Sequence, residues 1–538
     1  MLAKVYSAQV VGLKADLIDL EVDIARGLHS FSIVGLPDKA VEEAKDRISA
    51  AIKNSGFKSP QKSNKKVIVG LAPADLKKEG PVFDLAIALA YLLAGQELKF
   101  ESEGKLFIGE LALDGSLRAI KGPLMMVRRA QEAGFTEVYL PSGNAREAAL
   151  VPGIKVYACN HLRDIADHLS PPPKAALEKG TVKKRGQPLT FQPPTKITHQ
   201  ANTQATYDLS EIKGQQTAKR GLEIAAAGGH NLAMSGPPGT GKTMLAKAFA
   251  GLLPPLDFEA VLEVTGIHSA SGLINNDLIT EAPFRAPHHT ASYISLVGGG
   301  AWPKPGEITL AHRGILFLDE FPEFDKRVIE ALRQPLEDRV VRVSRARGSM
   351  TFPANFILIA AMNPCPCGNK GLRTKECICS QAALVRYGRK LSGPIVDRID
   401  LWLEVPQVDH ERLAASVVPA PTLRSGQTRF VGGFEESSST VRKRILEARR
   451  RQTQRFAAVG KEIHTNSDMG PKELRLFAPL NDKCAQLLTS SAKRLDLSAR
   501  AYHRTIKLAR TIADLAGSEH ITEQHLTEAL QYRPKIQP

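Results

Sequence analysis

Two patterns of apolar residues alternate along the first part of the chain. Short runs typical of strands occur at residues 30–37 (SFSIVGLP), 66–73 (KVIVGLAP) and 136–141 (TEVYLP). Between the first two runs, residues 38–56 place apolar side chains three or four positions apart, which predicts an amphipathic helix. The pattern therefore predicts a mixed α/β domain over residues 1–169.

Changes in composition and periodicity mark the domain boundaries. Residues 170–206 are rich in Pro, Lys, Gln and Thr and lack apolar periodicity, which predicts an extended linker. Residues 207–431 alternate apolar strands with helices and contain the strongest motifs, whereas residues 432–538 have helical periodicity almost throughout. The sequence thus predicts an N-terminal domain, a linker, an α/β core and a C-terminal helical domain.

An apolar run, a glycine-rich loop and a helical segment follow one another from Leu232 onward. The loop GPPGTGKT contains Gly236 and, after four residues, Gly241, Lys242 and Thr243, which is the spacing of a P-loop. Glycines let backbone N–H groups surround phosphates at the start of a helix, while Lys242 is expected to reach phosphate oxygens and Thr243 to ligate Mg²⁺. The predicted nucleotide-binding residues of the loop are Gly236, Pro237, Pro238, Gly239, Thr240, Gly241, Lys242 and Thr243.

Two further apolar strands end in polar residues. GILFLDEF ends in Asp319 and Glu320, and NFILIAAMNP ends in Asn363. Parallel strands present their carboxyl ends to one ligand crevice. Asp319 is therefore expected to complete the Mg²⁺ site, Glu320 to polarise the attacking water and Asn363 to orient it. In the alternative interpretation the acids are merely solvated and Asn363 is a structural cap.

The order of the motifs GPPGTGKT, LFLDE, AAMNPCPCG and SGPIVDRID resembles that of the ComM/YifB family, in the magnesium-chelatase-like branch of the AAA+ ATPases. The resemblance covers nearly the whole chain, and the segments FRAPHHT, LVGGG and PGEITLAHRG are its most diagnostic part. It implies an AAA+ P-loop NTPase core and a C-terminal helical lid, assembled as a homohexameric ring with ATP at the subunit interfaces. For ComM-like members it also implies a DNA helicase that promotes branch migration during natural transformation.

The resemblance implies roles for an arginine in DRID. Arg398 resembles the arginine finger that one subunit supplies to the γ-phosphate held by its neighbour. An ion pair with Asp397 or Asp400 is the alternative. The choice between them depends on where the side chain points, which the sequence does not give.

Other nucleotide-site roles are implied on either side of the core. Arg500 matches the position called sensor 2, and the segment LSEIKGQ, with Ile212 and Gly214, resembles the adenine side of the site. Arg504 and Lys507 share a helical face with Arg500. Beyond Arg500 we expect this face to be solvated.

The first 169 residues resemble the proteolytic domain of Lon proteases, a ribosomal S5 domain 2-like fold. Lon-type catalysis needs a Ser nucleophile and a Lys base. Val82 and Leu124 stand at the matching positions. We therefore expect no peptidase activity, and an interaction or DNA-guiding role instead.

The net charge of the chain favours a polyanionic partner. The 538 residues include 72 Lys and Arg against 56 Asp and Glu, a formal net charge of +16, which favours nucleic-acid binding. Two predicted insertions of the core, one within residues 281–311 and one hairpin before the strand of Asn363, hold basic residues suited to phosphate contacts. The candidates are Arg285, Lys304, Arg342, Arg345 and Arg347. Alternatively, these arginines pair with acids nearby.

Four of the six cysteines lie close together in a loop after Asn363: Cys365, Cys367, Cys377 and Cys379. Four thiolates suit a tetrahedral structural Zn²⁺, although one residue between the members of each pair is less common than two, and the loop could simply tolerate cysteines. No export signal is evident, and the apolar run at 85–95 is shorter than the ~20 residues that span a bilayer. We therefore expect a cytoplasmic protein with reduced thiols and no membrane partner.

Together these observations predict a Mg²⁺–ATP-dependent hexameric motor that acts on single-stranded and branched DNA, with recombination proteins as possible partners. Two alternatives stay open: a chelatase-like or chaperone-like ATPase that remodels a protein, and a regulatory ATPase acting through its N-terminal domain. Stimulation of ATP turnover by DNA would distinguish the motor from both.

Overall fold

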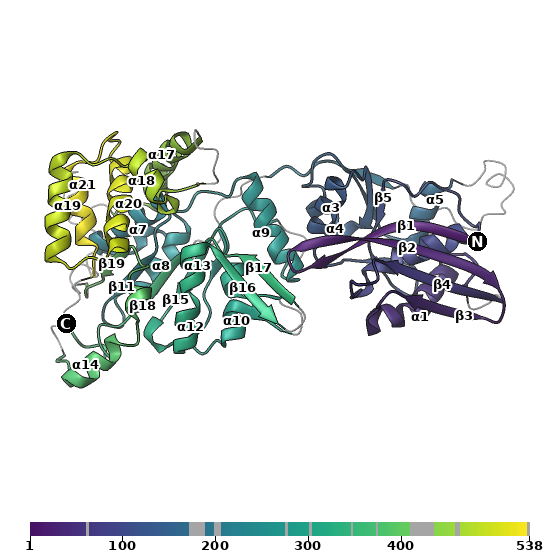
Figure 1. Ribbon diagram of the computed structural model, residues 1–538, viewed down its shortest axis with the longest axis horizontal. Helices are drawn as coiled ribbons and strands as arrows, with labels where there is room; N and C mark the ends of the chain where they lie inside the picture. The colour runs from purple at the N-terminus through teal and green to yellow at the C-terminus, as the bar shows by residue number, and fades with distance from the viewer. Residues whose placement is uncertain are drawn as a thin grey trace, which may run out of the picture. The chain divides into compact units, whose positions relative to one another are not determined.

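The computed structural model describes residues 1–60, 64–171, 189–197, 206–274, 278–300, 304–345, 348–372, 375–408, 435–457 and 463–534. The chain forms two units (Figure 1). Unit 1 contains Met1–Thr198 together with Phe258–Ile279, and unit 2 contains His199–Asp257 together with Thr280–Pro538. A segment from the middle of the predicted α/β core therefore belongs with the N-terminal unit.

Unit 1 is built on a mixed eight-stranded sheet with the strand order β10-β9-β8-β5-β1-β2-β4-β3. Its strands are β1 (Leu2–Val11), β2 (Lys14–Arg26), β3 (Ser30–Val34), β4 (Lys65–Ala72), β5 (Lys105–Phe107), β8 (Glu137–Pro141), β9 (Lys155–Cys159) and β10 (Thr190–Gln192). β1 and β2 form a long antiparallel hairpin, and Ile18, Leu20 and Val22 alternate along β2 toward the core. The predicted strands at 30–37, 66–73 and 136–141 are confirmed as β3, β4 and β8.

In the described residues before the linker, the helices beside this sheet are α1 (Lys39–Asn54), α2 (Asp84–Ala94), α3 (Pro123–Glu132), α4 (Ser142–Ala148) and α5 (Leu162–Leu169). The Asp38 side chain caps α1 by accepting from the Val41 N–H at 2.8 Å. α2 is buried along almost its whole length, and its first residue, Asp84, pairs with Arg47 of α1 at 2.6 Å. The short elements η2 (Pro81–Phe83), β6 (Glu110–Leu111) and β7 (Leu117–Arg118) complete this part.

The predicted linker is partly structured. Residues 190–192 form strand β10, which pairs antiparallel with β9, and Phe191 meets Tyr157 edge to face with ring centroids 6.5 Å apart. This stretch is extended, as predicted, but it is a strand of the sheet in unit 1 and not a free connection, because a Thr-Phe-Gln run fits an open sheet edge. Residues 172–188 and 198–205 lie outside the described part of the chain.

Val82 and Leu124, which the resemblance to Lon proteases implies at the positions of the catalytic groups, are core residues. Val82 lies in η2 with 7% of its surface exposed, and Leu124 lies in α3 with 1% exposed. Both side chains therefore contribute apolar packing at positions where that chemistry would need polar groups.

The segment from the middle of the chain enters unit 1 as helix α9 (Phe258–Ala270). Most of its residues are buried, and it packs against α3. The Ser269 hydroxyl accepts from the Gly122 N–H at 3.0 Å and also bonds to the Glu147 carboxyl of α4. Because this polar link lies between otherwise apolar surfaces, it fixes the position of α9 relative to α3 and α4.

Burial makes Glu147 a source of pH-dependent stability. Burial raises the pKa of this carboxyl to about 7, although hydrogen bonds from Ser269 and from the Leu124 backbone act in the opposite direction and lower the pKa. Since the folded-state pKa is above the unfolded value, the contribution of Glu147 to the stability of unit 1 is fully present at acidic pH and is lost as pH rises through 7. We expect Glu147→Gln to stabilise the protein by on the order of 2 kcal/mol at pH 8 and hardly at all at pH 4.

Calorimetry at the two pH values measures this difference. Glu132→Gln is the matched control, because Glu132 is half-exposed and pairs with Arg128 on the surface of α3. An equal effect of Glu147→Gln at both pH values would rule out the buried carboxyl as the cause.

Unit 2 contains a five-stranded parallel sheet with the order β12-β15-β18-β11-β19. Its strands are β11 (Leu232–Ser235), β12 (Phe284–Arg285), β15 (Ile315–Leu318), β18 (Ile357–Met362) and β19 (Leu401–Glu404). β15 and β18 are buried at every position, as expected for a parallel sheet covered on both faces. The carboxyl ends of β11, β18 and β15 lie next to one another, which confirms the predicted parallel arrangement of the three motif strands.

Short elements of unit 2 surround this sheet: η3 (Leu209–Glu211), α7 (Gln216–Gly228), α8 (Lys242–Ala250), α10 (Tyr293–Val297), α11 (Glu307–Leu310), η4 (Phe321–Glu323), α12 (Lys326–Ala331), α13 (Arg333–Asp338), α14 (Gln381–Gly388) and α15 (Gly393–Val396). The described part of unit 2 also contains two hairpins, β13 (Gly298–Gly299) with β14 (Lys304–Pro305) and β16 (Val340–Arg345) with β17 (Gly348–Pro353). The second one immediately precedes β18. No helix within the described residues is long and apolar enough to cross a membrane.

The C-terminal part of unit 2 is helical, as predicted. Its elements are α17 (Ser438–Phe456), η6 (Asn466–Asp468), α18 (Pro471–Phe477), α19 (Asp482–Arg494), α20 (Ala499–Leu515) and α21 (Glu523–Gln531), and Figure 1 shows the helices gathered at one end of the unit. α17 and α20 both pack on α7. Several arginines of the basic run in α17 have internal partners: Arg444 pairs with Glu223, Arg449 donates to the Ala226 carbonyl, and Arg455 pairs with Asp514. Much of the charge of this run therefore serves folding.

Candidate nucleotide-binding and catalytic site

The P-loop lies between β11 and α8, and its backbone requires its glycines. Gly239 and Gly241 have φ angles of +77° and +88°, in the left-handed region that glycine tolerates. A Cβ on Gly236 would lie 2.1 Å from the Val405 carbonyl oxygen of the neighbouring strand end. The Thr240 hydroxyl donates to the Pro237 carbonyl at 2.9 Å, which closes the loop. The loop thus ends at the N-terminus of α8, where a helix favours anions.

Lys242 is buried at the start of α8. Its ammonium donates to the carbonyls of Gly236 at 2.6 Å and Pro237 at 2.8 Å, and to Asn363 Oδ1 at 3.3 Å. Burial lowers the pKa of Lys242, and the charge of Asp319 acts in the opposite direction. The structure therefore brings the P-loop lysine and the predicted water-orienting amide into direct contact.

Thr243 and Asp319 form the pair expected to hold Mg²⁺. The Thr243 hydroxyl donates to Asp319 Oδ2 at 2.8 Å, across 76 residues of sequence. A hydroxyl and a carboxylate oxygen are ligands of the kind that Mg²⁺ takes beside phosphates. The donor set of these two residues therefore fits the predicted ion.

Glu320, next to Asp319, is held in an uncommon backbone conformation. Its φ is +52°, although it carries a side chain, and 54% of that side chain is exposed. Such conformations cost free energy and persist where the surrounding structure enforces them. Here the conformation turns the chain into η4 immediately after the strand and leaves the carboxylate accessible.

His289 is a site residue that the sequence analysis did not assign. Its Nδ1 lies 3.0 Å from Glu320 Oε2, and its ring lies beside that of His288, with centroids 4.2 Å apart. The histidine follows β12, which neighbours β15 in the sheet, so the two strand ends bring the imidazole to the acid. The sequence feature that could have identified His289 is the pair of histidines in FRAPHHT, which follows a short strand.

Arg398 and Arg500 meet at one carboxylate. Arg398 is almost fully buried and pairs with Glu337 Oε2 of α13, and Arg500 donates to Glu337 Oε1 at 2.6 Å. The alternative interpretation, an ion pair within the subunit, is thus present, but its acid is Glu337 and not Asp397 or Asp400; the Arg398 side chain is 9% exposed and that of Glu337 44% exposed. Within the subunit the implied arginine finger and the implied sensor 2 arginine are thus held together through Glu337.

The expected solvation of Arg504 and Lys507 is also wrong. Arg504 is 19% exposed and donates to Asp400 Oδ1 at 2.5 Å, and Lys507 donates to the Ser467 carbonyl at 2.8 Å. Burial lowers the pKa of Lys507 to about 8. The basic face of α20 is buried because it has acceptors there: the Asp400 carboxylate, just before β19, for Arg504, and the Ser467 carbonyl of η6 for Lys507.

The segment implied to lie on the adenine side does adjoin the P-loop. Ile212 is buried, and Gly214, with a φ of +65°, donates its N–H to Glu435 Oε1 at 2.8 Å. The neighbouring Gln215 side chain donates to the carbonyls of Thr240, at 3.4 Å, and of Pro406. Gln215 therefore connects this segment to the loop, a contact that the sequence analysis missed.

The candidate DNA contacts differ in their environments. Arg285 makes a bidentate ion pair with Glu307 of α11, at 2.6 and 2.8 Å, as the alternative interpretation supposed. Lys304 is exposed on β14, and Arg342 is exposed on β16 between buried valines. The side chain of Arg345 and the whole of Arg347 lie outside the described residues.

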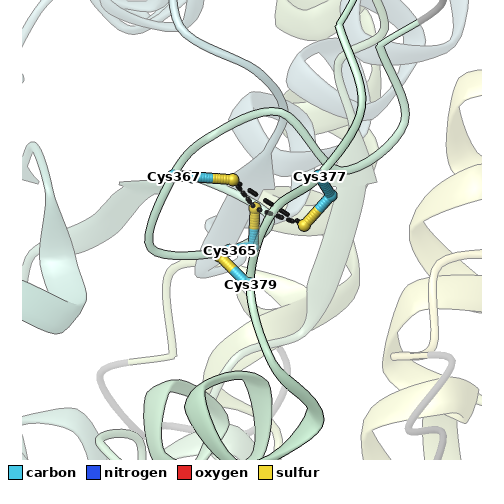
Figure 2. A group of neighbouring side chains, drawn as sticks. All are labelled: Cys365, Cys367, Cys377 and Cys379. Carbon is cyan, nitrogen blue, oxygen red and sulfur yellow. Dashed lines mark hydrogen bonds between the residues drawn. The ribbon is translucent and has the colours of Figure 1, made fainter.

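The four clustered cysteines converge within one loop, as Figure 2 shows. The Sγ atoms of Cys365 and Cys367 are 3.4 Å apart, and each is 3.7 Å from Cys377 Sγ. All four Sγ atoms, that of Cys379 included, lie within 4.8 Å of one another. The structure therefore brings together all the predicted metal ligands of this loop.

Comparison with known proteins places these features in a family. The family models described as "Magnesium chelatase, subunit ChlI", "Subunit ChlI of Mg-chelatase" and "Magnesium chelatase, subunit ChlI C-terminal" match residues 208–413, 20–144 and 435–533. The chain is 42% identical to competence protein ComM of Haemophilus influenzae, over 99% of this chain and 98% of that protein. It is equally 42% identical to a YifB protein of Salmonella typhimurium, over 99% and 97% of the two chains.

A more distant likeness is to the magnesium-chelatase 67 kDa subunit of Heliobacterium mobile, with 27% identity over 42% of this chain and 40% of that protein. The two full-length relatives and the three family models together cover both units, the parallel sheet with its P-loop, and the C-terminal helices. The chain belongs to the ComM/YifB family of magnesium-chelatase-like proteins.

Proposed function

We propose that this protein hydrolyses ATP with Mg²⁺ at the carboxyl ends of β11, β15 and β18. One observation carries the proposal: the contacts of Lys242 with Asn363, of Thr243 with Asp319 and of Glu320 with His289 converge from the ends of four neighbouring strands, β12, β15, β18 and β11. Each pair combines a predicted site residue with a partner distant in sequence. Such convergence of complementary chemistry at one sheet edge is the form of a phosphoryl-transfer site.

The chain's own residues have distinct tasks in this reaction. The P-loop N–H groups and the Lys242 ammonium hold the phosphates, and Thr243 and Asp319 would hold Mg²⁺, which supplies charge neutralisation when it is bound. Glu320 accepts the proton of the attacking water, and the contact with His289 positions its carboxylate. Asn363 orients that water from the next strand. Ile212 and Gly214 border the base.

The complete site requires a second subunit. We propose a homohexameric ring in which Arg398 contacts the γ-phosphate held by the neighbouring subunit, and Arg500 acts as sensor 2. Because both arginines bind Glu337, either one must leave that carboxylate in order to reach a phosphate. ATP binding would thus be coupled to rearrangement of α13 and α20, the elements from which Glu337 and Arg500 extend.

We further propose that ATP hydrolysis moves single-stranded and branched DNA and promotes branch migration. The basic net charge, the exposed Arg342 and Lys304, and the identity to a competence protein support this. The N-terminal domain, which we propose to be a non-catalytic Lon-like fold, would guide DNA or recombination proteins in the cytoplasm, and residues 432–538 would act as the helical lid. A chelatase-like protein-remodelling activity is the other candidate, favoured by the family models.

DNA binding should depend on the β16–β17 hairpin. We expect Arg342→Ala to weaken binding of single-stranded DNA several-fold and to make the dependence of log K on log salt shallower, because each phosphate contact releases counterions. Arg475→Ala is the matched control, since Arg475 is an exposed arginine on α18 of the same unit. Fluorescence anisotropy across a salt series measures the DNA affinity and its salt dependence. Equal effects of the two variants would mean that DNA responds to the overall charge of the protein and not to this hairpin.

A further inference from the structure

The loop between β18 and α14 has few apolar residues to hold it in place. In its described part, Cys365 is buried, whereas Pro366 and Lys370 are exposed and the Ile378 side chain is 85% exposed. Helix α14, which follows directly, has no buried residue. Segments without a hydrophobic core of their own need another source of stability, such as a disulfide or a metal.

The cysteine geometry matches a metal site. With Zn–S bonds of about 2.3 Å, the sulfur atoms of a tetrahedral site are about 3.8 Å apart, whereas a disulfide brings two sulfurs to about 2.05 Å. The Sγ–Sγ distances among Cys365, Cys367 and Cys377 are 3.4, 3.7 and 3.7 Å, and Figure 2 shows these three sulfurs turned toward one another. The Sγ of Cys379 lies within 4.8 Å of each of them. The spacing of three sulfurs is therefore that of ligands around one ion, and the fourth lies close enough to complete the set.

Backbone donors surround the sulfurs. The Lys370 N–H donates to Cys365 Sγ at 3.4 Å, and the N–H groups of Asn369 and Ile378 donate to Cys367. N–H donors of this kind stabilise thiolates and orient them as ligands. Four thiolates this close would repel one another without a cation.

We propose that Cys365, Cys367, Cys377 and Cys379 bind one structural Zn²⁺ that fastens this loop beside the nucleotide site. Because four protein sulfurs fill the tetrahedral shell, the ion has no open position for substrate and its role is structural. The metal substitutes for the missing apolar core of the loop and sets the start of α14.

The loop is joined to the P-loop and to Asn363. A Cβ on Gly368 would lie 2.8 Å from Cδ of Pro238, so the cysteine loop packs directly against the tip of the P-loop. Tyr387 of α14 is hydrogen-bonded to the backbone of Asn363, two residues before Cys365. Loss of the ion would therefore loosen both contacts and reduce ATP turnover, a consequence that rests on the proposed ATPase function, whereas the metal site itself does not.

Metal content of the full-length protein, purified under reducing conditions without added metal, tests the site. We expect about one Zn²⁺ per chain by mass spectrometry of the elements. Cys367→Ser and Cys377→Ser should each lose most of it, whereas Cys484→Ala, which alters an isolated buried cysteine of unit 2, should retain it. Iron in place of zinc, or retention of the full zinc content by both cluster variants, would overturn the assignment.

The wild-type protein provides a test that does not depend on folding of the variants. We expect alkylation of the native protein to spare the four cluster thiols until a chelator is added, with increased hydrogen exchange then confined to the loop and α14. Co²⁺ added to the chelated protein should give the absorption bands of tetrahedral cobalt thiolate. Cluster thiols that react at the same rate with and without chelator would contradict the proposal.

The variant Glu320→Gln separates the proposed zinc site from the proposed ATPase function. This variant should bind Zn²⁺ normally even though its ATP turnover is strongly reduced, so a failed ATPase proposal would leave the metal result unchanged. Conversely, wild-type protein without metal but with full ATP turnover would refute the zinc site and leave the ATPase intact.

Discussion

Replacing Glu320 by Gln is expected to lower the rate of ATP hydrolysis by about 10²–10⁴-fold, because the amide cannot accept the proton of the attacking water. ATP binding should stay within a few-fold of wild type, since Lys242, Thr243 and Asp319 make their contacts without Glu320. Steady-state turnover and equilibrium binding of a fluorescent ATP analogue measure the two quantities separately.

Glu323→Gln is the matched control for this variant. Glu323 lies three residues further on, in η4, and its carboxylate pairs with Lys390 at 2.7 Å rather than with a residue of the site. Its turnover should be close to wild type. If Glu320→Gln kept more than about a tenth of wild-type turnover, water activation would have to be assigned to another group.

Replacing Arg398 by Ala is expected to reduce ATP turnover by about 10³-fold or more, the usual effect of removing an arginine finger. Because Arg398 also binds Glu337 within its own subunit, loss of activity alone does not separate a catalytic from a structural role. Mixing two kinds of variant subunit separates the two roles. A subunit with Arg398→Ala retains a P-loop, and a subunit with Lys242→Ala retains the arginine.

If Arg398 acts on a neighbour, each variant alone should be inactive and an equimolar mixture should recover activity at about a quarter of its interfaces. The measurement is the ATP turnover of co-refolded or exchanged rings, with the assembly state checked by light scattering. A mixture as inactive as its components would place the role of Arg398 within its own subunit, in the pair with Glu337.

The parts of the site that are local in sequence could be predicted. A P-loop needs a strand, glycines at fixed positions and a helix, all within about twenty residues, so Gly236 to Thr243 were assigned from the pattern alone. Asp319 and Asn363 followed, because buried parallel strands must end at one edge. The resemblance to a family supplied Arg398, Arg500, Ile212 and Gly214, which no local pattern indicates.

Partners distant in sequence could not be predicted. Glu337 binds Arg398 across 61 residues and Arg500 across 163, and a glutamate in a short helix gives no sign of either contact. The same holds for His289 beside Glu320, which depends on two short strands being neighbours. Helix α9 was placed with the core because it lies between core motifs, yet its apolar surface is buried against α3 of unit 1.

The central claim is that ATP hydrolysis at this site drives movement on DNA. The most direct measurement is branch migration of a synthetic four-way DNA junction by the full-length protein with Mg²⁺ and ATP, with ATP turnover recorded in the same reaction. We expect forked or single-stranded DNA to raise turnover, and junction products to form with wild-type protein but not with Glu320→Gln. Products formed equally by that variant, or turnover indifferent to every DNA tested, would contradict this claim.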